Sequence, residues 1–257
     1  MENYEPGMSY DEDVAEAYDN VTHHGDEMDT VAFLEQLARG GPVLELGIGT
    51  GRIALPLAAR GIRVDGIDFS PAMVARLQAK PGGGQLAVTM GNFADVAVSG
   101  TYRLIYVIFN SLFNLLTQDE QVRCFENAAA HLADDGIFVV EGTVPADIYR
   151  LPDIQDADSE AIGPDNLRLA ALGAGGAGNL HLGTARHDPV KQLLEETHVI
   201  RSSKGTHLNR IVTRYAWPAE LDLMARIAGL RLKERWADWS REPFEATSGN
   251  CVSVYGR

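Results

Sequence analysis

The chain has 257 residues, 45% of them hydrophobic, and a formal net charge of −14. This length and composition suit one globular α/β domain with an elaboration, and the negative charge argues against binding DNA or RNA through the phosphate backbone. No apolar run approaches the ~20 residues of a membrane span, and residues 1–5 lack the basic and apolar regions of a signal peptide. Cys124 and Cys251 are too few for a disulfide framework, so we expect buried thiols in a reducing cytoplasm.

Helical and strand-like patterns alternate through the first half of the chain. Apolar residues at helical spacing over 11–24 predict an amphipathic N-terminal helix, and a second helix is expected over 30–38. The pattern that follows predicts strands at 43–46, 62–67, 86–90, 102–109 and 137–141, helices at 51–60, 71–79 and 118–132, and a turn at 134–136. Strands that alternate with helices in this way form a doubly wound, mostly parallel sheet in an α/β fold.

The second half of the chain has a different pattern. Residues 145–165 are rich in proline and aspartate and predict an irregular excursion. Strand-like segments follow at 167–169, 179–182, 195–201 and 207–217, with a flexible turn over 173–178. We expect them to form an inserted antiparallel β platform laid over the sheet. A helix at 218–228 and strands at 231–236 and 251–255 then complete a seven-stranded sheet, the two strands as an antiparallel edge pair.

The most informative segment is the run Val-Leu-Glu-Leu-Gly-Ile-Gly-Thr-Gly-Arg from Val43 to Arg52. It predicts a buried strand that breaks into a tight loop and continues as a helix. Glycine tolerates the left-handed backbone of such a turn and allows a ligand to approach the backbone closely. Asp68 closes the next predicted strand, where a carboxylate can accept hydrogen bonds from both hydroxyls of a ribose. Together these features indicate a nucleoside-containing cofactor across the carboxyl ends of two parallel strands.

The spacing of the glycines separates two classes of cofactor. A dinucleotide-binding loop has the pattern Gly-x-Gly-x-x-Gly/Ala. Here the third glycine, Gly51, comes one residue early, and Arg52 stands where the small residue should be. The run Glu45-x-Gly47-x-Gly49-x-Gly51 instead resembles motif I of the class I S-adenosylmethionine-dependent methyltransferases. In that family the loop passes the amino-acid portion of the cofactor, which carries no pyrophosphate.

The resemblance extends over most of the chain. Residues 40–144 are similar to the cofactor-binding core of that family, and 218–257 to the elements that complete it. The insertion at 145–217 resembles the substrate cap of small-molecule members, including sugar N-methyltransferases of antibiotic biosynthesis. The segment 1–39 resembles their helical lid, and its run from Ala15 to Asp19 matches their Ala-x-x-Tyr-Asp pattern. The resemblance implies an S-adenosyl-L-methionine-dependent methyltransferase, with S-adenosyl-L-homocysteine as product, that acts on a nitrogen or oxygen of a small molecule.

The resemblance also places the cofactor-binding residues. Asp68 is expected at the ribose, and Phe69 or Met73 at the adenine, although both could be core residues. Arg52 could pair with the cofactor carboxylate or be a helix-surface side chain, and Asn92 stands where the family commonly has aspartate. The full predicted set is Tyr18, Glu45, Gly47, Gly49, Arg52, Asp68, Phe69, Met73, Asn92, Phe93 and Phe109.

Two residues are candidates for a catalytic role. Tyr18, on the predicted lid helix, could orient the nucleophile or touch the sulfonium, and the alternative is a core tyrosine. Glu141 ends the fifth strand at the edge where ligands bind, as a substrate contact, a general base or a structural residue. Histidine suits proton transfer near neutral pH, but no pattern selects among His23, His24, His181, His198 and His207. No cluster has the spacing of metal ligands, so no metal is predicted.

Three functions remain open at the level of sequence. The leading one is a small-molecule methyltransferase. The alternatives are a nucleotide-dependent oxidoreductase on a related sheet, and a catalytically inactive protein of the same fold that only binds its ligand. The expected partner is a small-molecule substrate, and binding to nucleic acid or to a membrane is not expected. The edge of the platform could also allow two subunits to pair as a homodimer. The acceptor atom and the general base are not determined by the residues alone.

Overall fold

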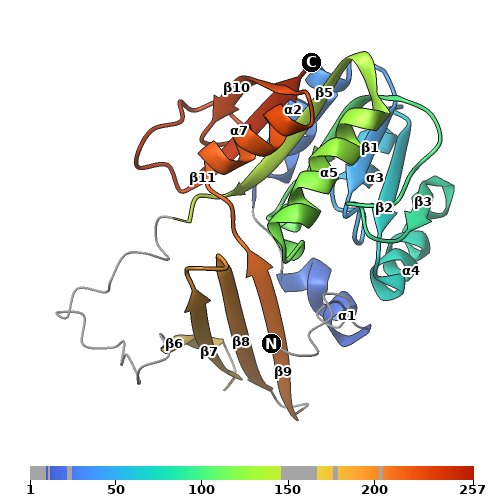
Figure 1. The fold of residues 1–257 in the computed structure, drawn as a ribbon. Coiled ribbons are helices and arrows are strands. Elements are labelled where there is room, and N and C mark those ends of the chain that lie inside the picture. Colours follow the sequence, from blue (N-terminus) through green and yellow to red (C-terminus); the bar gives the residue numbers. More distant parts are fainter. Residues whose placement is uncertain (1–9, 11, 22–24, 146–166, 176–178, 203–204) are drawn as a thin grey trace.

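The computed structural model describes residues 10, 12–21, 25–145, 167–175, 179–202 and 205–257 (Figure 1). Its core is a seven-stranded sheet with the order β10-β11-β5-β4-β1-β2-β3. The strands are β1 (Val43–Leu46), β2 (Val64–Asp68), β3 (Ala87–Met90), β4 (Tyr102–Val107), β5 (Leu132–Thr143), β10 (Arg231–Trp236) and β11 (Asn250–Gly256). Strands β1 to β5 run parallel, whereas β11 is antiparallel to both β5 and β10. The predicted doubly wound, mostly parallel sheet with an antiparallel edge pair is confirmed.

Helices surround this sheet, and there are two short 3₁₀ helices among the described residues. One of them precedes β3 and the other follows β4. The helices are α1 (Glu12–Val21), α2 (Glu27–Ala38), α3 (Ala54–Ala59), α4 (Pro71–Ala79), α5 (Gln118–His131), α7 (Pro218–Ile227), η2 (Gly83–Gln85) and η3 (Ser111–Asn114). The start of α4 follows from its sequence. Ser70 accepts a hydrogen bond from the Met73 N–H over 3.2 Å, and Pro71 occupies the first turn.

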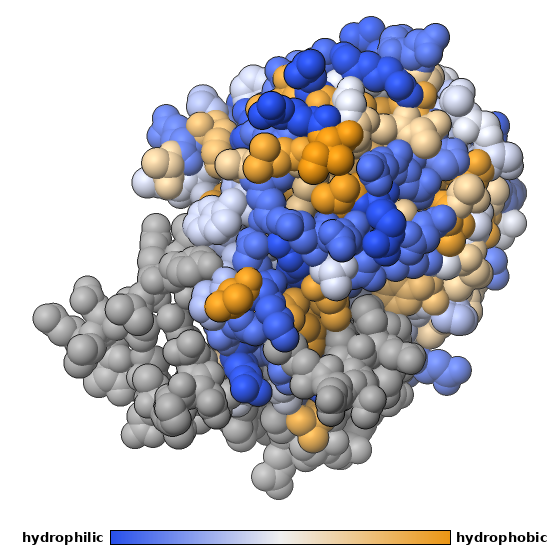
Figure 2. Space-filling view, viewed as in Figure 1, coloured by the Kyte–Doolittle hydropathy of each residue, from blue (hydrophilic) through white to orange (hydrophobic). Residues whose placement is uncertain are grey.

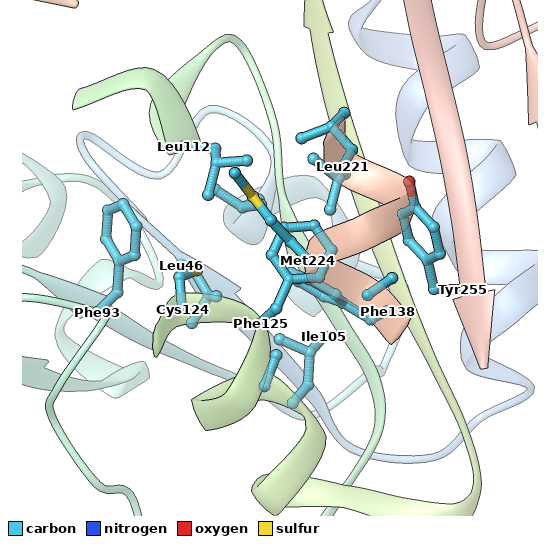
Figure 3. Packing of buried hydrophobic residues seen from close by; sticks show 14 of the residues in the cluster. Leu46, Phe93, Ile105, Leu112, Cys124, Phe125, Phe138, Leu221, Met224 and Tyr255 are labelled. Atoms are coloured by element: carbon cyan, nitrogen blue, oxygen red, sulfur yellow. The ribbon is translucent and has the colours of Figure 1, made fainter. Parts of the chain in front are cut away.

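Two hydrophobic clusters bury the two faces of the sheet. In the first, the Phe125 ring of α5 meets the rings of Phe138 and Tyr255 edge-on, at centroid distances of 5.1 and 5.7 Å (Figure 3). The second cluster includes Tyr106 of β4 and Val139 of β5, together with residues of α2 and α3. Because successive strand residues point to opposite faces, β4 and β5 are covered on both sides. This explains why their sequences are almost continuously apolar.

The structure moves several predicted boundaries. Helix α3 begins at Ala54 and not at residue 51, because Gly51 has a left-handed backbone (φ 80°) that an α-helix does not accept. Strand β5 begins at Leu132 and runs through the predicted turn at 134–136, where a register shift against β4 absorbs the additional residues. Strand β6 continues to Gly175, through the first part of the predicted turn at 173–178. Residues 1–5, 22–24, 146–165 and 176–178 lie outside the described residues.

The second sheet is the inserted platform. It consists of β6 (Leu167–Gly175), β7 (Asn179–Asp188), β8 (Leu193–Ser202) and β9 (Gly205–Arg214), in that order and antiparallel throughout. Figure 1 shows this sheet beyond one end of the core and beside α1, and not over a face of the large sheet as expected. Strand β9 contacts η3, the turn that follows β4. The platform therefore adjoins the carboxyl edge of the core strands.

A buried polar network joins the platform to the core. Arg214, the last residue of β9, is 4% exposed and donates to Glu220 on α7 and to Gln192, each over 2.7 Å. It also donates to Gln121 on α5, whose amide donates back to the Arg214 carbonyl over 2.7 Å and to the Leu115 carbonyl over 3.1 Å. A buried guanidinium requires such partners, since an unpaired buried charge is costly. The network fixes β9 against α5, α7 and the chain after η3.

Helix α7 has one buried and one exposed apolar face. Leu221, Met224 and Ala225 face the core, whereas Leu223 and Ile227 are exposed. Figure 2 shows hydrophobic side chains gathered over α7, with hydrophilic residues around them. Within the described residues, no helix is both long and apolar enough to cross a bilayer.

The two cysteines are buried and free, as predicted from the sequence. Cys124 lies within α5 and Cys251 within β11. Burial raises the pKa of the Cys251 thiol to about 11, so this side chain is protonated at neutral pH.

Candidate active site

A pocket opens at the carboxyl ends of β1, β2 and β4, where the strand order reverses. Its volume is about 420 Å³, which includes the solvent space at its open mouth. It is lined by Tyr10, Tyr18, Gly47, Gly49, Asp68, Phe69, Met73, Phe93, Phe109, Ser111 and Asn114. The sequence predicts eight of these eleven residues as cofactor ligands. The fold therefore brings most of the predicted set together, while the contact of each with a cofactor stays a prediction.

The glycine loop forms one wall of the pocket. Gly47 has φ 79°, and its N–H donates to the Ile67 carbonyl of β2 over 2.8 Å. Gly51 has φ 80°, and a Cβ atom there would lie 2.2 Å from Cδ1 of Leu77 on α4. The backbone conformation favours glycine at both positions, and the packing against α4 excludes a side chain at the second. The loop can therefore present bare backbone to a ligand.

Asp68 lies at the end of β2 and is 6% exposed. Its Oδ2 accepts from the Gly49 N–H over 2.7 Å, and its Oδ1 from the Ser70 N–H over 2.8 Å. Burial raises the pKa of this carboxyl, and the backbone N–H groups act in the opposite direction because they stabilise the charge. These backbone bonds fix the orientation of the carboxylate.

A second part of the pocket lining is apolar. Phe69, Met73 and Phe93 line the pocket, and the last two are almost fully buried. Asn92, predicted at the adenine, is not among the lining residues. Its Oδ1 accepts from the Ala94 N–H over 2.9 Å and so stabilises the turn after β3. A contact of Asn92 with the cofactor stays a prediction.

Two tyrosines of the N-terminal segment, Tyr10 and Tyr18, line the pocket. The Tyr10 ring meets the rings of Tyr18 and Phe69 edge-on, at centroid distances of 6.4 and 6.1 Å. Helix α1 is tied to the glycine loop through Asp19, which accepts from the Thr50 hydroxyl over 2.6 Å and forms a 2.7 Å ion pair with Lys80. The carboxylate of Asp19 thus connects α1 to both the loop and the residue that follows α4.

Tyr18 combines a pocket position with a neutral phenol. Its pKa is raised by burial and by the nearby carboxylates of Asp68 and Glu45, while Arg52 acts in the opposite direction. Because the ordinary value is 10.0, the hydroxyl keeps its proton at neutral pH. It can therefore donate or accept a hydrogen bond, but it does not act as a preformed base.

Arg52 lies behind Phe109. Its Nη1 is 3.2 Å from Oε1 of Glu27 on α2, and its guanidinium carbon is 3.5 Å from the centroid of the Phe109 ring. This stacking is a cation–π contact that holds the ring. Arg52 does not line the pocket. The predicted pairing of Arg52 with the cofactor carboxylate stays a prediction, and it would compete with the bond to Glu27.

Glu45 lies below the loop and is 4% exposed. Its Oε2 accepts from the Tyr106 hydroxyl over 2.9 Å. Burial raises the pKa of this carboxyl to about 8, against the hydrogen bond from Tyr106 and the charge of Arg52. Glu45 is not among the lining residues either, and its predicted contact with the cofactor stays a prediction.

Glu141 lies two residues before the end of β5, beside the turn that follows β4. It is 7% exposed, and its Oε2 accepts from the Phe109 N–H over 2.5 Å. Burial raises the pKa of Glu141 to about 7; the Phe109 N–H and the charge of Arg52 lower it, while the charge of Asp26 raises it further. Glu141 does not line the pocket. Its predicted role as a substrate contact or general base stays a prediction.

Three lining residues are absent from the predicted set: Tyr10, Ser111 and Asn114. Tyr10 precedes the predicted lid helix and comes near the pocket only because α1 folds back over the core. Ser111 and Asn114 lie in η3, and the polar residues directly after an apolar strand were the available signal for them. Of the candidate histidines, His23 and His24 and the side chains of His181 and His207 lie outside the described part of the chain.

Comparison with known proteins identifies the family. Residues 43–136 match a family model described as a methyltransferase domain. The solved structure of the CcbJ methyltransferase from Streptomyces caelestis is 36% identical to this chain, with a TM-score of 0.85, over 98% of this chain and 99% of that one. The chain belongs to the class I S-adenosylmethionine-dependent methyltransferases.

Two further relatives of this methyltransferase cover nearly the whole chain. The cypemycin N-terminal methyltransferase of a Streptomyces species is 28% identical over 251 residues, which are 96% of this chain and 97% of that protein. The S-adenosylmethionine-bound structure of CalS10, an amino pentose methyltransferase from Micromonospora echinaspora, is 19% identical with a TM-score of 0.64. It covers 99% of each chain and shows the shared fold.

Family membership decides between the functions that the sequence left open. It confirms the resemblance drawn from motif I, the assignment as an enzyme and S-adenosylmethionine as the cofactor. The nucleotide-dependent oxidoreductase and the inactive binding protein are not favoured. Among the described residues of this methyltransferase, no group of three metal-ligating side chains is gathered at one place.

Proposed function

We propose that this methyltransferase transfers the methyl group of S-adenosylmethionine to an amine nitrogen of a small natural product. The observation that carries the proposal is the buried carboxylate of Asp68, fixed by Gly49 and Ser70 in the lining of the glycine-loop pocket. The choice of nitrogen is supported by the relative named as the cypemycin N-terminal methyltransferase, which matches 96% of the chain.

The pocket residues fit the chemical groups of the cofactor. The Asp68 carboxylate is an acceptor that suits the two ribose hydroxyls. Phe69, Met73 and Phe93 offer the apolar surface that an adenine ring requires. Gly47 and Gly49 offer uncovered backbone for the amino-acid portion.

When bound, S-adenosylmethionine supplies an electrophilic methyl carbon on a sulfonium. The task of the protein is to align the acceptor and to exclude water, and alignment contributes a large share of the rate. Tyr18 keeps its proton, because burial raises its pKa. Its oxygen can accept a hydrogen bond from the N–H of the substrate amine and so orient the nitrogen lone pair. An amine attacks in its neutral form, and the proton it loses passes to solvent.

We assign a separate role to each of four consecutive segments of the chain. Residues 1–39 act as a lid, 40–144 hold the cofactor, 145–217 cap the acceptor, and 218–257 complete the core sheet. The lid role is supported by Tyr10 and Tyr18, which line the pocket, and by the bonds of Asp19 to Thr50 and Lys80. The cap role is supported by the contact of β9 with η3, which supplies Ser111 and Asn114 to the same pocket.

The proposal extends to the setting of the enzyme. Two buried, free cysteines are compatible with a reducing cytoplasm, and a net charge of −14 disfavours nucleic acid as a partner. Strand β6 is at the edge of the four-stranded sheet, and an unpaired strand edge is a surface through which two subunits can pair as a homodimer.

The first experiment measures cofactor binding. Calorimetric titration with S-adenosylhomocysteine and, separately, with NAD would use the wild-type protein and Asp68→Ala. We expect micromolar binding of S-adenosylhomocysteine that the substitution weakens roughly 10- to 100-fold, and no binding of NAD. Absence of S-adenosylhomocysteine binding to the wild-type protein would contradict the cofactor half of the proposal.

The second experiment addresses the acceptor. The enzyme would be incubated with methyl-labelled S-adenosylmethionine and either an amino pentose or a peptide with a free N-terminus. The matched controls are the same two compounds with their amines acetylated. We expect label in at least one free amine and in neither acetylated form. Equal labelling of free and acetylated compounds would place the transfer on another atom and overturn the choice of nitrogen.

A further inference from the structure

The turn between β4 and η3 has an unusual backbone. Phe109 and Asn110 are consecutive residues in the left-handed region, with φ 55° and 59°, and neither is a glycine. L-residues pay a steric cost in this conformation, and asparagine less than others. Such a turn persists only where its surroundings hold it in place.

The carboxyl end of β5 supplies the groups that hold this turn. Oε2 of Glu141 accepts from the Phe109 N–H over 2.5 Å. Asn110 makes a pair of bonds to Thr143, in which its Oδ1 accepts from the Thr143 N–H over 2.7 Å and its Nδ2 donates to Oγ1 over 3.1 Å. Gly142 lies between these two anchors, and a Cβ atom there would lie 2.9 Å from the Phe113 ring and 3.3 Å from Oδ1 of Asn110.

The held turn forms part of the pocket. The Phe109 ring lines the pocket on one side and stacks on the Arg52 guanidinium, 3.5 Å from its centroid. The turn leads directly into η3, which adds Ser111 and Asn114 to the lining. A change in the backbone of the turn would therefore displace three lining residues together.

We propose that Glu141 is a positioning residue, which acts through the Phe109 N–H to hold the left-handed turn and the pocket wall that follows it, and not a proton acceptor. The proposal rests on the proposed function, since it concerns the same pocket. Glu141 does not line the pocket, and its Oε2 is engaged by the backbone of Phe109. A carbonyl oxygen can replace a carboxylate in this role, because only an acceptor for one N–H is required.

The test compares two substitutions of different chemistry. Glu141→Gln keeps an acceptor of the same shape but cannot take a proton, whereas Glu141→Leu keeps the volume and removes the acceptor. Glu126→Gln, on the exposed face of α5, is the matched control. Affinity for S-adenosylhomocysteine is measured by calorimetry, and the pH dependence of kcat is measured with the free amine that takes up label in the wild-type protein. Thermal unfolding of each variant checks the fold.

A positioning role predicts rescue by the conservative variant. Glu141→Gln should bind S-adenosylhomocysteine within about threefold of wild type and keep the pH profile, and Glu141→Leu should bind about tenfold or more weakly, because its Phe109 N–H has lost its acceptor. A proton-acceptor role predicts the reverse: Glu141→Gln would lose about 100-fold or more in kcat at unchanged affinity. That result, or full affinity in Glu141→Leu, would overturn the proposal.

A double-mutant cycle distinguishes the turn from a general loss of stability. Asn110→Ala removes the second anchor of the same turn, and its combination with Glu141→Leu should weaken binding by clearly less than the product of the two single effects. Independent, multiplicative effects would mean that the two side chains do not act on one element. Failure of the wild-type protein to bind S-adenosylhomocysteine would instead contradict the proposed function, so the two failures are separable.

Discussion

The hydroxyl of Tyr106 on β4 donates to the carboxylate of Glu45 on β1 over 2.9 Å, and both side chains are buried beneath the glycine loop. The two residues lie on neighbouring parallel strands, with Glu45 directly opposite Tyr106 in the register. Glu45 therefore lies under the glycine loop that follows it in the sequence. Its hydrogen bond connects β1 to β4, the two strands between which the strand order reverses.

The raised pKa of Glu45 predicts that stability falls as pH rises. The folded value is about 8 and the ordinary value 4.5, so the folded state holds a proton that the unfolded state releases above the ordinary value. The stabilisation is complete below that value and is lost as pH rises through about 8. Urea unfolding from pH 5 to 9 should show this decline, and Glu45→Gln should reduce it. An equal decline in both proteins would contradict this prediction.

Removal of the Asp68 carboxylate is expected to weaken cofactor binding strongly. Asp68→Ala deletes a charged acceptor and leaves the Gly49 and Ser70 N–H groups without it. Loss of charge-assisted bonds of this kind should lower the affinity for S-adenosylhomocysteine roughly 10- to 100-fold, as measured by calorimetry. Asp95→Ala, at an exposed ion pair with Arg123, is the control and should bind normally. Comparable losses in both variants would point to the net charge and not to the site.

The tie between α1 and the glycine loop predicts a kinetic effect. Lys80 bonds both Asp19 and the Thr50 carbonyl, each over 2.7 Å. Lys80→Met should loosen α1 and speed the dissociation of S-adenosylhomocysteine about three- to fivefold, since partly exposed ion pairs contribute up to about 1 kcal/mol. Stopped-flow displacement measures the rate. Arg60→Met removes the ion pair with Glu35 of α2, which does not involve α1, and its dissociation rate should match that of wild type.

Gly51 and Gly61 offer a matched pair for the packing of the loop. Both have a left-handed backbone, with φ 80° and 83°, but a Cβ atom at Gly51 would lie 2.2 Å from Leu77, whereas one at Gly61 would meet nothing within 4 Å. Gly61→Ala should cost about 1 kcal/mol for the backbone alone. Gly51→Ala should cost about 2–4 kcal/mol, because overpacking is added. Urea unfolding measures both, and equal losses would show that the loop can move away from α4.

Much of the fold follows from local pattern. The strands around Val43 and Tyr102 are apolar because both of their faces are covered, and Ser70-Pro71 carries the signal for the start of α4 in two adjacent residues. The glycine loop and Asp68 follow in the same way, because a tight turn after a strand and an acidic residue at the end of the next are local requirements. Local pattern does not predict where α3 and β5 begin. The start of α3 at Ala54 depends on the left-handed backbone of Gly51, and the start of β5 at Leu132 depends on its register against β4.

The sheet, the cofactor class and the residues of the loop can be predicted from local pattern, since each depends on neighbours in the chain. Which side chains face the pocket and which lie behind its lining depends on how the strands and helices are assembled. Arg52, Glu45 and Glu141 all adjoin the site, yet they form hydrogen bonds with Glu27, Tyr106 and the Phe109 backbone, respectively. Pairings between residues on different elements leave no periodic trace in a sequence. For that reason the roles of these three side chains become visible only when the strands are assembled.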